Sequence, residues 1–330
     1  MRSKKANHRI KYLVHINKVV YLAILEPLVN KTKIEGYRKF LGFQYCLANT
    51  NGKIWCFWNH LDQADVIANE EQHITINFKD RNGANSRYVS AIYAKCTDGD
   101  RRDLWDSMEN ISSSINDPWC VGGDFNDIMD PDEKFGGKPH RANRCFDFIS
   151  TMEACGLSDL GFVGPKYTWC NNRRPSKRIW KRLDRVFVND LWAQSYHTNT
   201  IKHLARTGSD HRPLLMQTLS NQNDFIRYFR FLNLWTQQSS FLETVQNSWN
   251  MNVTGNAMWR LQCKLKALSK NLSKWSRETI GDIHEQVNKW ETRVQLLEEL
   301  DTLNNNEQSR EDLNREHAEY VNGLECRMLY

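Results

Sequence analysis

The chain has 330 residues, of which 40% are hydrophobic and 25% are charged, the composition of an ordinary globular protein. This length predicts one large domain with an appendage rather than a single core. The best apolar stretch, Val19 to Val29, contains Glu26 and falls short of the roughly 20 residues of a membrane helix, so we expect no membrane span. The nine cysteines show no CxxC spacing, which predicts reduced thiols in the nucleus or cytoplasm rather than a disulfide framework or a zinc cluster.

Charge is distributed unevenly along the chain. Residues 1–220 carry a net charge of +8, whereas residues 221–330 carry −2. A positive field around the first part of the chain is expected when the ligand is a polyanion such as nucleic acid. The charge distribution therefore predicts a site for a polyanionic ligand within residues 1–220 and a different role for residues 221–330.

The N-terminal part alternates from helix to strands. Residues 8–18 have the spacing of a short amphipathic helix, and residues 19–25 read as a strand buried on both faces that ends on Glu26. Taken alone, Glu26 is either a solvated strand end or a ligand-binding group. Short β segments follow at residues 43–47, 54–58, 73–78 and 87–94, the first two joined by a hairpin at Asn51-Gly52. Tyr93 falls near the end of the last segment.

The central motif is an apolar strand, residues 119–122, that follows a helix at 100–115 and opens on Gly122-Gly123-Asp124-Phe125-Asn126. Asp124 and Asn126 are two residues apart and would project from the same side of an extended segment. A carboxylate and a carboxamide together offer ligands for a hard cation and a phosphate oxygen. The alternative is a strand followed by an Asx turn.

A basic segment follows a helix at 143–155 and β pieces at 157–160 and 167–170. Seven basic residues lie between positions 173 and 185, interleaved with tryptophans, against the single acid Asp184. This pattern predicts a surface for phosphates and bases, and the alternative is a solvated loop. The candidate nucleic-acid-binding residues are Trp169, Arg173, Arg174, Lys177, Arg178, Lys181 and Arg182.

Two further acids and one histidine complete the candidates. Asp184 begins an apolar strand at residues 184–188, and Ser209-Asp210-His211 precedes another strand at 214–216. An Asp-His pair is too short a motif to distinguish a site from a turn. Beyond residue 221 the leucine and tryptophan spacing predicts long helices, a basic one at 256–277 and an acidic one after Glu278, paired about Gly281 or forming a docking arm.

Taken in order, these motifs resemble those of the endonuclease/exonuclease/phosphatase superfamily, the metal-dependent phosphodiesterases similar to apurinic endonucleases and DNase I. More narrowly, the chain resembles the endonuclease domain of a plant LINE (non-LTR) retrotransposon polyprotein. The motifs that carry the narrower resemblance are Leu22-Ala-Ile-Leu-Glu-Pro27, Tyr167-Thr-Trp169, Arg182-Leu-Asp-Arg-Val-Phe-Val188 and Phe231-Leu-Asn-Leu-Trp235.

The resemblance implies an α/β fold of the DNase I-like four-layer sandwich type, with two mixed β-sheets packed face to face between outer helices. Residues 1–220 would form this domain, and residues 221–330 an α-helical linker that precedes a reverse transcriptase in such polyproteins. The implied activity is hydrolysis of DNA phosphodiester bonds by nicking, with Mg²⁺ or Mn²⁺, with DNA as partner, and with neither a membrane nor a small organic cofactor.

Site roles also follow from the resemblance. Glu26 and Asp210 would hold the metal ion, and Asp124 would position or deprotonate the attacking water. Asn126 would hold a phosphate oxygen with the help of Tyr93, and His211, oriented by Asp184, would contact the scissile phosphate.

One departure from the family pattern stands at the N-terminus. Family members begin with a strand carrying Trp-Asn and a glycine, whose Asn belongs to the metal site, whereas this sequence opens on Met1-Arg-Ser-Lys-Lys-Ala-Asn7. Asn7 lies in a basic, helical stretch and is no substitute. We therefore expect a copy truncated at both ends with weakened catalysis. The alternatives are a catalytically inactive nucleic-acid-binding remnant and an interaction protein that works through its C-terminal helices.

Overall fold

The computed structural model describes residues 4–59, 63–80, 85–139, 145–196, 198–206, 208–219, 235–236, 238–279 and 283–328. Contacts divide the chain into two units. The first comprises Met1–Asn221 together with Gln295–Asn314, and the second comprises Gln222–Val294 together with Arg315–Tyr330. The expected division into residues 1–220 and 221–330 stays a prediction, and the first unit also takes in the later segment Gln295–Asn314.

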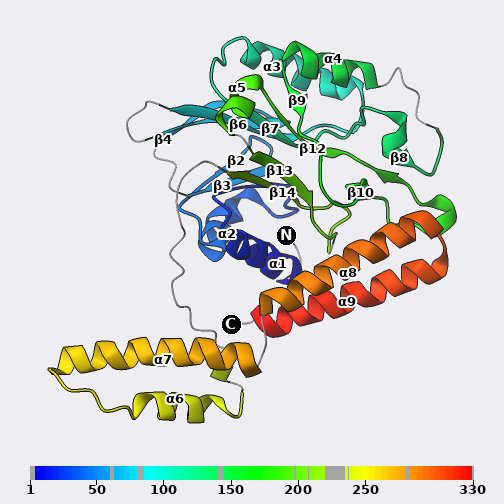
Figure 1. Cartoon of the computed structure of the whole chain (residues 1–330). Coiled ribbons are helices and arrows are strands. Elements are labelled where there is room, and N and C mark those ends of the chain that lie inside the picture. The colour runs from blue at the N-terminus through cyan, green and yellow to red at the C-terminus, as the bar shows by residue number, and fades with distance from the viewer. Residues whose placement is uncertain are drawn as a thin grey trace. The chain divides into compact units, whose positions relative to one another are not determined.

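A six-stranded sheet forms the centre of the first unit (Figure 1). Its strand order is β4-β5-β6-β7-β12-β9, and all neighbours are antiparallel except β6 and β7, which run parallel. The strands span Gln63–Asn69 (β4), His73–Lys79 (β5), Ser86–Tyr93 (β6), Trp119–Asp124 (β7), Asp184–Val188 (β12) and Ser158–Asp159 (β9). The expected strands at 73–78, 87–94, 119–122 and 184–188 are confirmed.

Two smaller sheets cover one face of the large sheet. One has the order β1-β3-β2, and its hairpin at Asn51-Gly52 is confirmed by the antiparallel pairing of β2 with β3. The other is the β13-β14 pair. Buried side chains of β3, β5 and β6 join the first of them to the large sheet, and side chains of β7, β12 and β13 join the second. The strands span Tyr21–Leu25 (β1), Tyr45–Ala48 (β2), Ile54–Trp58 (β3), Thr198–His203 (β13) and Leu214–Leu219 (β14).

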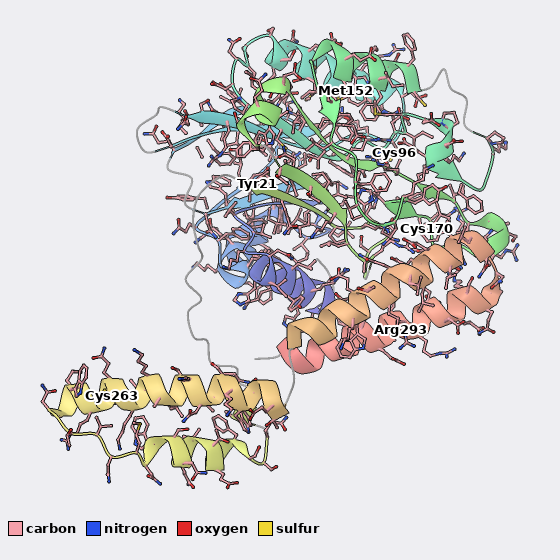
Figure 2. The ribbon with its side chains drawn as sticks, in the orientation of Figure 1. Tyr21, Cys96, Met152, Cys170, Cys263 and Arg293 are labelled. Carbon is pink, nitrogen blue, oxygen red and sulfur yellow. The ribbon has the colours of Figure 1, made fainter. Side chains whose placement is uncertain are left out.

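Helices form the outer layers. α3 (Arg102–Ser112) and α4 (Phe146–Ala154) pack on the opposite face of the large sheet through Trp105, Phe148 and Met152, and Met152 is labelled on that side in Figure 2. α1 (Lys4–Ile16) and α2 (Ile34–Leu41) cover the three-stranded sheet through Ile10, Val14 and Leu41. Two sheet layers between two helical layers confirm the expected α/β sandwich. A third small sheet has the order β10-β11-β8, with strands Trp169–Cys170, Trp180–Lys181 and Lys134–Phe135, and α5 spans Asp190–Ser195.

The C-terminal part is helical, as expected, with α6 (Phe241–Trp249), α7 (Ala257–Thr279), α8 (Ile283–Asn304) and α9 (Glu307–Met328). In the second unit α7 packs on α6 through Trp235, Phe241, Leu272 and Trp275. The expected turn at Gly281 and residues 231–234 of the Phe-Leu-Asn-Leu-Trp motif lie outside the described residues. Among the described helices, none is both long and apolar enough for a membrane span.

Candidate active site

Three of the candidate residues lie in a single row across the large sheet. The register pairs Tyr93 of β6 with Asp124 of β7, and Asp124 with Asp184 of β12. Residues in register point to the same face of a sheet, here the face covered by the smaller sheets. Asp124 and Asp184 are therefore buried side by side at the ends of their strands, with side chains 4% and 8% exposed.

Gly123 makes this arrangement possible. It has φ +150°, and a Cβ atom built on it would lie 2.0 Å from the carbonyl oxygen of Ile92 on β6. A side chain at this position would therefore collide with the backbone of the neighbouring strand. The glycine lets β6 and β7 approach closely enough for Tyr93 and Asp124 to share a row.

His211 joins the row from the loop before β14. Its Nδ1 donates a hydrogen bond of 2.9 Å to Asp184 Oδ2, and its Nε2 lies 3.8 Å from Asp124 Oδ2. Burial lowers the pKa of His211, but the Asp184 carboxylate outweighs this effect and raises the pKa to about 9. The ring is therefore an imidazolium at neutral pH, with one nitrogen held by Asp184 and the other directed towards Asp124.

The surroundings of Asp124 disfavour its charged form, whereas those of His211 favour the charged form. Burial, and next the charge of Asp184, raises the pKa of Asp124 to about 7, although His211 opposes the shift. A carboxylate with a pKa near neutrality can accept a proton from water under physiological conditions. Asp124 thus has the properties of a general base.

Asn126 closes one side of the site. Its backbone N–H donates to Asp124 Oδ1 at 2.9 Å, and its amide nitrogen donates to the Ala94 carbonyl at 2.7 Å and reaches Asp124 Oδ2 at 3.3 Å. Its φ of +51° is a left-handed conformation, which asparagine tolerates better than most residues. This geometry includes the Asx turn considered from the sequence, so the turn and the site are the same structure.

Glu26 lies just beyond β1 and is bound by two donors. Lys53 Nζ is 3.1 Å from Glu26 Oε1, and the Tyr93 hydroxyl donates a hydrogen bond to the same carboxylate. Burial disfavours ionisation of Glu26, but the hydrogen bonds from Tyr93 and Lys53 outweigh it and lower its pKa. Its φ of +45° is uncommon for glutamate, and such strained positions cluster at functional sites.

Asp210 is held in place by β10. Trp169 Nε1 donates to Asp210 Oδ2 at 3.1 Å, and the Cys170 backbone N–H donates to the Asp210 carbonyl, also at 3.1 Å. Trp169 further forms an isolated β-bridge with His211. β10 is thereby attached to the loop that carries Asp210 and His211.

A family model for the endonuclease/exonuclease/phosphatase family matches residues 54–211, a range that contains the row and His211. This part of the chain, just under half of its length, is therefore similar to the endonuclease/exonuclease/phosphatase family. No curated protein matches the sequence.

Solved structures align with about two thirds of the chain. The endonuclease domain of TRAS1, a telomere-specific non-LTR retrotransposon, aligns with a TM-score of 0.51 and 17% identity over 67% of this chain and 95% of its own. The AP endonuclease LMAP from Leishmania major aligns with a TM-score of 0.49 and 13% identity over 64% of this chain and 82% of its own. At 17% identity the TRAS1 likeness shows the fold, which is the DNase I-like sandwich expected from the sequence.

The donor set of the candidate site fits a hard cation. Glu26 and Asp184 both raise the pKa of Asp124, and Asp210 opposes the ionisation of Glu26 in the same way. These four carboxylates therefore repel one another, and a divalent cation would relieve that repulsion. One ligand atom from each of Asp124, Asp184 and His211 also lies within 4.8 Å of the others, so these residues are a second candidate position for a cation.

Only some of the residues of the predicted basic surface are exposed. Arg173, Arg174 and Lys177 are exposed, and Lys181 and Trp169 are half-buried. Arg178 and Arg182, by contrast, are buried: Arg178 pairs with Asp301, and Arg182 pairs with Glu133 and Asp159. For these two residues the expectation of phosphate contact needs correction, because their charges are satisfied inside the protein.

Two residues of the site had no role assigned from the sequence. Thr168 is fully buried, and its Oγ1 accepts hydrogen bonds from the backbone N–H groups of Leu183 and Asp184 at 2.9 and 3.0 Å, which fixes the start of β12. Lys53 reaches Glu26 because the Glu26 N–H donates to the Lys53 carbonyl beside the β1–β3 pair. Asn7 lies in α1, where its amide nitrogen is 3.4 Å from the Tyr37 hydroxyl, so it has no place in this site.

Proposed function

We propose that the first unit is a Mg²⁺- or Mn²⁺-dependent DNA endonuclease of the retroelement type, which nicks one strand by hydrolysing a phosphodiester bond. The observation that carries the proposal is the buried Tyr93–Asp124–Asp184 row with His211 spanning its two carboxylates. A base near neutrality beside a fixed cation is the pair that attack of water on a phosphodiester requires. In polyproteins of this type a reverse transcriptase domain is the expected companion.

Each residue has a role that its surroundings support. Asp124 takes the proton of the attacking water, since its pKa is about 7. The His211 imidazolium compensates the charge that develops on the phosphate, and Asp184 fixes which nitrogen faces the substrate. Both amide hydrogens of Asn126 have partners in the free protein, so we expect the one near Asp124 to turn to a phosphate oxygen.

Glu26 and Asp210 are the residues that would hold the metal ion. When bound, the ion would polarise the phosphoryl oxygen and stabilise the leaving alkoxide. Tyr93 remains neutral, because burial and the hydrogen bond to Glu26 raise its pKa, and it therefore orients the Glu26 carboxylate by donating to it. The exposed Arg173, Arg174 and Lys177 supply phosphate contacts away from the reacting bond.

Nicking of supercoiled plasmid tests the proposal. The purified chain is incubated with Mg²⁺, with Mn²⁺ and with EDTA, alongside the Asp124→Ala and His211→Ala variants. Asp147→Ala serves as control, because Asp147 is an exposed acid on α4, on the other face of the large sheet. We expect metal-dependent nicking that both site variants lose and the control keeps.

Two outcomes would contradict the proposed endonuclease activity or its site. If the folded chain binds DNA but does not nick it, the exposed basic residues support the alternative of a catalytically inactive nucleic-acid-binding module. If Asp124→Ala nicks as fast as the parent chain, the residue has no role in the observed activity and the proposed site is wrong.

A further inference from the structure

The first unit contains a segment from beyond its expected boundary. Residues 295–314 comprise the last turns of α8, a turn at Asn305 with φ +44°, and the first turns of α9. We call this segment the α8–α9 hairpin. It carries two acids with almost no exposure, Glu298 at 0% and Asp301 at 2%. Charged groups this deeply buried need partners, and their partners lie on the two loops that border the site.

Glu298 holds the loop that carries the catalytic histidine. It forms ion pairs with Arg212, the residue directly after His211, and with Arg206 at 3.5 Å. The Arg212 guanidinium also donates to the Tyr167 carbonyl at 2.8 Å and to the Leu204 carbonyl at 3.3 Å. Arg212 is therefore anchored to three segments of the protein at once. The backbone that leads into His211 has little freedom while Glu298 is in place.

Asp301 holds the basic loop. Its carboxylate is 2.5 Å from Arg178 Nη1, and Arg310 of the same hairpin donates to the backbone carbonyls of Asn172 and Arg173. The loop continues from β10, which is itself bonded to Asp210. Arg173, Arg174 and Lys177 remain exposed on this loop, so the hairpin fixes their backbone without using their charges.

The two anchors belong to one helix. Glu298 and Asp301 are three residues apart on α8 and therefore lie on the same face, about one turn from each other. A helix is rigid over this length, so it sets the distance between the loop of His211 and the basic loop. Buried ion pairs are costly to form, and their best-attested use is to specify one arrangement of the parts that they join.

We propose that the α8–α9 hairpin is a working part of the nuclease, in which Glu298 is a positioning residue for His211 and Asp301 is a positioning residue for the phosphate-binding loop 172–178. The inference rests on the proposed nuclease function for its kinetic consequences. It assigns different consequences to the two acids. Loss of the Glu298 contact disturbs the chemical step, whereas loss of the Asp301 contact disturbs the binding of DNA.

The kinetic test uses the full chain and a labelled DNA duplex. We expect Glu298→Gln to lower kcat about tenfold or more with KM within about twofold, and Asp301→Asn to raise KM about tenfold with kcat within about twofold. Glu311→Gln is the matched control, since Glu311 is an exposed acid of the same hairpin, on α9. Glu298→Asp keeps the charge and should recover part of kcat. Melting temperatures of all variants establish that each is folded.

Amide exchange followed by mass spectrometry provides a readout that does not need activity. We expect Glu298→Gln to accelerate exchange in the peptide carrying Arg212, Asp301→Asn to accelerate it in the peptide carrying Arg178, and Glu311→Gln to change neither. If the parent chain does not nick DNA, these exchange rates still show the positioning contacts while the proposed function fails.

Two results would overturn the inference. One is unchanged exchange in both peptides. The other is a parallel loss of kcat and DNA affinity in both variants, in proportion to their loss of melting temperature, as expected of acids that only stabilise the fold.

Discussion

Asp124 and Asp184 lie opposite each other in the antiparallel β7–β12 pair, and the imidazole ring of His211 lies near both carboxylates. His211 Nδ1 is 2.9 Å from Asp184 and Nε2 is 3.8 Å from Asp124. The same Asp184 charge that raises the pKa of Asp124 also raises that of His211. The Asp184 carboxylate thereby makes Asp124 a stronger base and keeps His211 cationic. A base and a cation are the two groups that the proposed hydrolysis needs.

The ionised form of Asp124 should reduce the stability of the fold. Its pKa of about 7 exceeds that of an unfolded aspartate, so the folded state holds more protons between about pH 4 and 7 and loses stability as the pH rises through this window. We expect Asp124→Asn to abolish nicking yet raise the free energy of unfolding by about 1–3 kcal/mol at pH 8, offset in part by the lost attraction to His211. Denaturant unfolding at pH 8 and pH 4 measures the effect. An equal change at both pH values would contradict the assignment.

The pH dependence of nicking should have an alkaline limb near 9, where His211 loses its proton. The stabilisation from the imidazolium is fully present below its unfolded pKa of about 6.5 and is lost as the pH rises through 9. Asp184→Asn removes the main attraction and should move the alkaline limb down by more than about one unit. The acid limb should lie near 7 at low metal concentration and move lower as Mg²⁺ is added, because a nearby cation favours the charged form of Asp124. A rate that does not depend on pH between 6 and 10 would contradict both roles.

Glu26 and Lys53 allow a test of the metal site. Glu26→Gln should weaken Mn²⁺ binding about tenfold or more, since one anionic oxygen ligand is lost. Lys53→Met should leave binding unchanged or tighten it, because the ammonium at 3.1 Å competes with the cation for the same carboxylate. Calorimetric titration with Mn²⁺ measures both. Weaker binding in Lys53→Met would show that the ammonium supports the site rather than competing for it.

Gly123 should be intolerant of any side chain. Alanine at this position would place its Cβ 2.0 Å from the Ile92 carbonyl oxygen, which forces β6 and β7 apart and should cost about 3 kcal/mol or more of stability. Gly36→Ala is the contrasting control, since Gly36 lies in α2 with no heavy atom within 4 Å of the added methyl group, and it should gain about 0.5–1 kcal/mol. Thermal unfolding of the two variants compares them directly.

The basic residues should separate into two classes. Lys177→Ala should weaken DNA binding and reduce the slope of log affinity against log salt by about one, because each released phosphate contact contributes about that much. Arg182→Ala should instead lower stability by about 1–3 kcal/mol, because it removes one of the two buried arginines, Arg182 and Arg185, that pair with Glu133 and Asp159. Salt titration of DNA affinity and denaturant unfolding distinguish the classes. A salt slope that changes equally in both variants would show that Arg182 reaches DNA after all.

Local patterns were sufficient for much of the fold and for the ends of its strands. The apolar runs at residues 54–58 and before Gly122-Gly123 predict β3 and β7, and the alternation of residues 73–78 predicts β5. β4 and β13 were not predicted, because β4 is a largely exposed edge strand and β13 alternates between polar residues. Strands with so few apolar residues carry little of the hydrophobic pattern from which strands are predicted.

Long-range pairing is what local patterns could not supply. The row of Tyr93, Asp124 and Asp184 depends on the register between strands that are distant in sequence. Arg178 is 123 residues from Asp301 and Arg182 is 49 residues from Glu133, so the basic segment contains arginines whose buried partners are distant in the sequence. The site roles came from family resemblance and stay predictions; they concern Glu26, Tyr93, Asp124, Asn126, Asp184, Asp210 and His211.

The shared row makes the site unusually sensitive to reading-frame-preserving deletions. Side chains along β7 alternate between the helix-covered face and the face of the site, so removal of one residue between Trp119 and Gly122 would either shift the strand or turn Asp124 to the wrong side. Point substitutions elsewhere in β7 leave that parity intact. The loss of a single residue from β7 would therefore remove the Asp124 carboxylate from the row as completely as substitution of Asp124 itself, while much of the hydrophobic pattern of the fold survives.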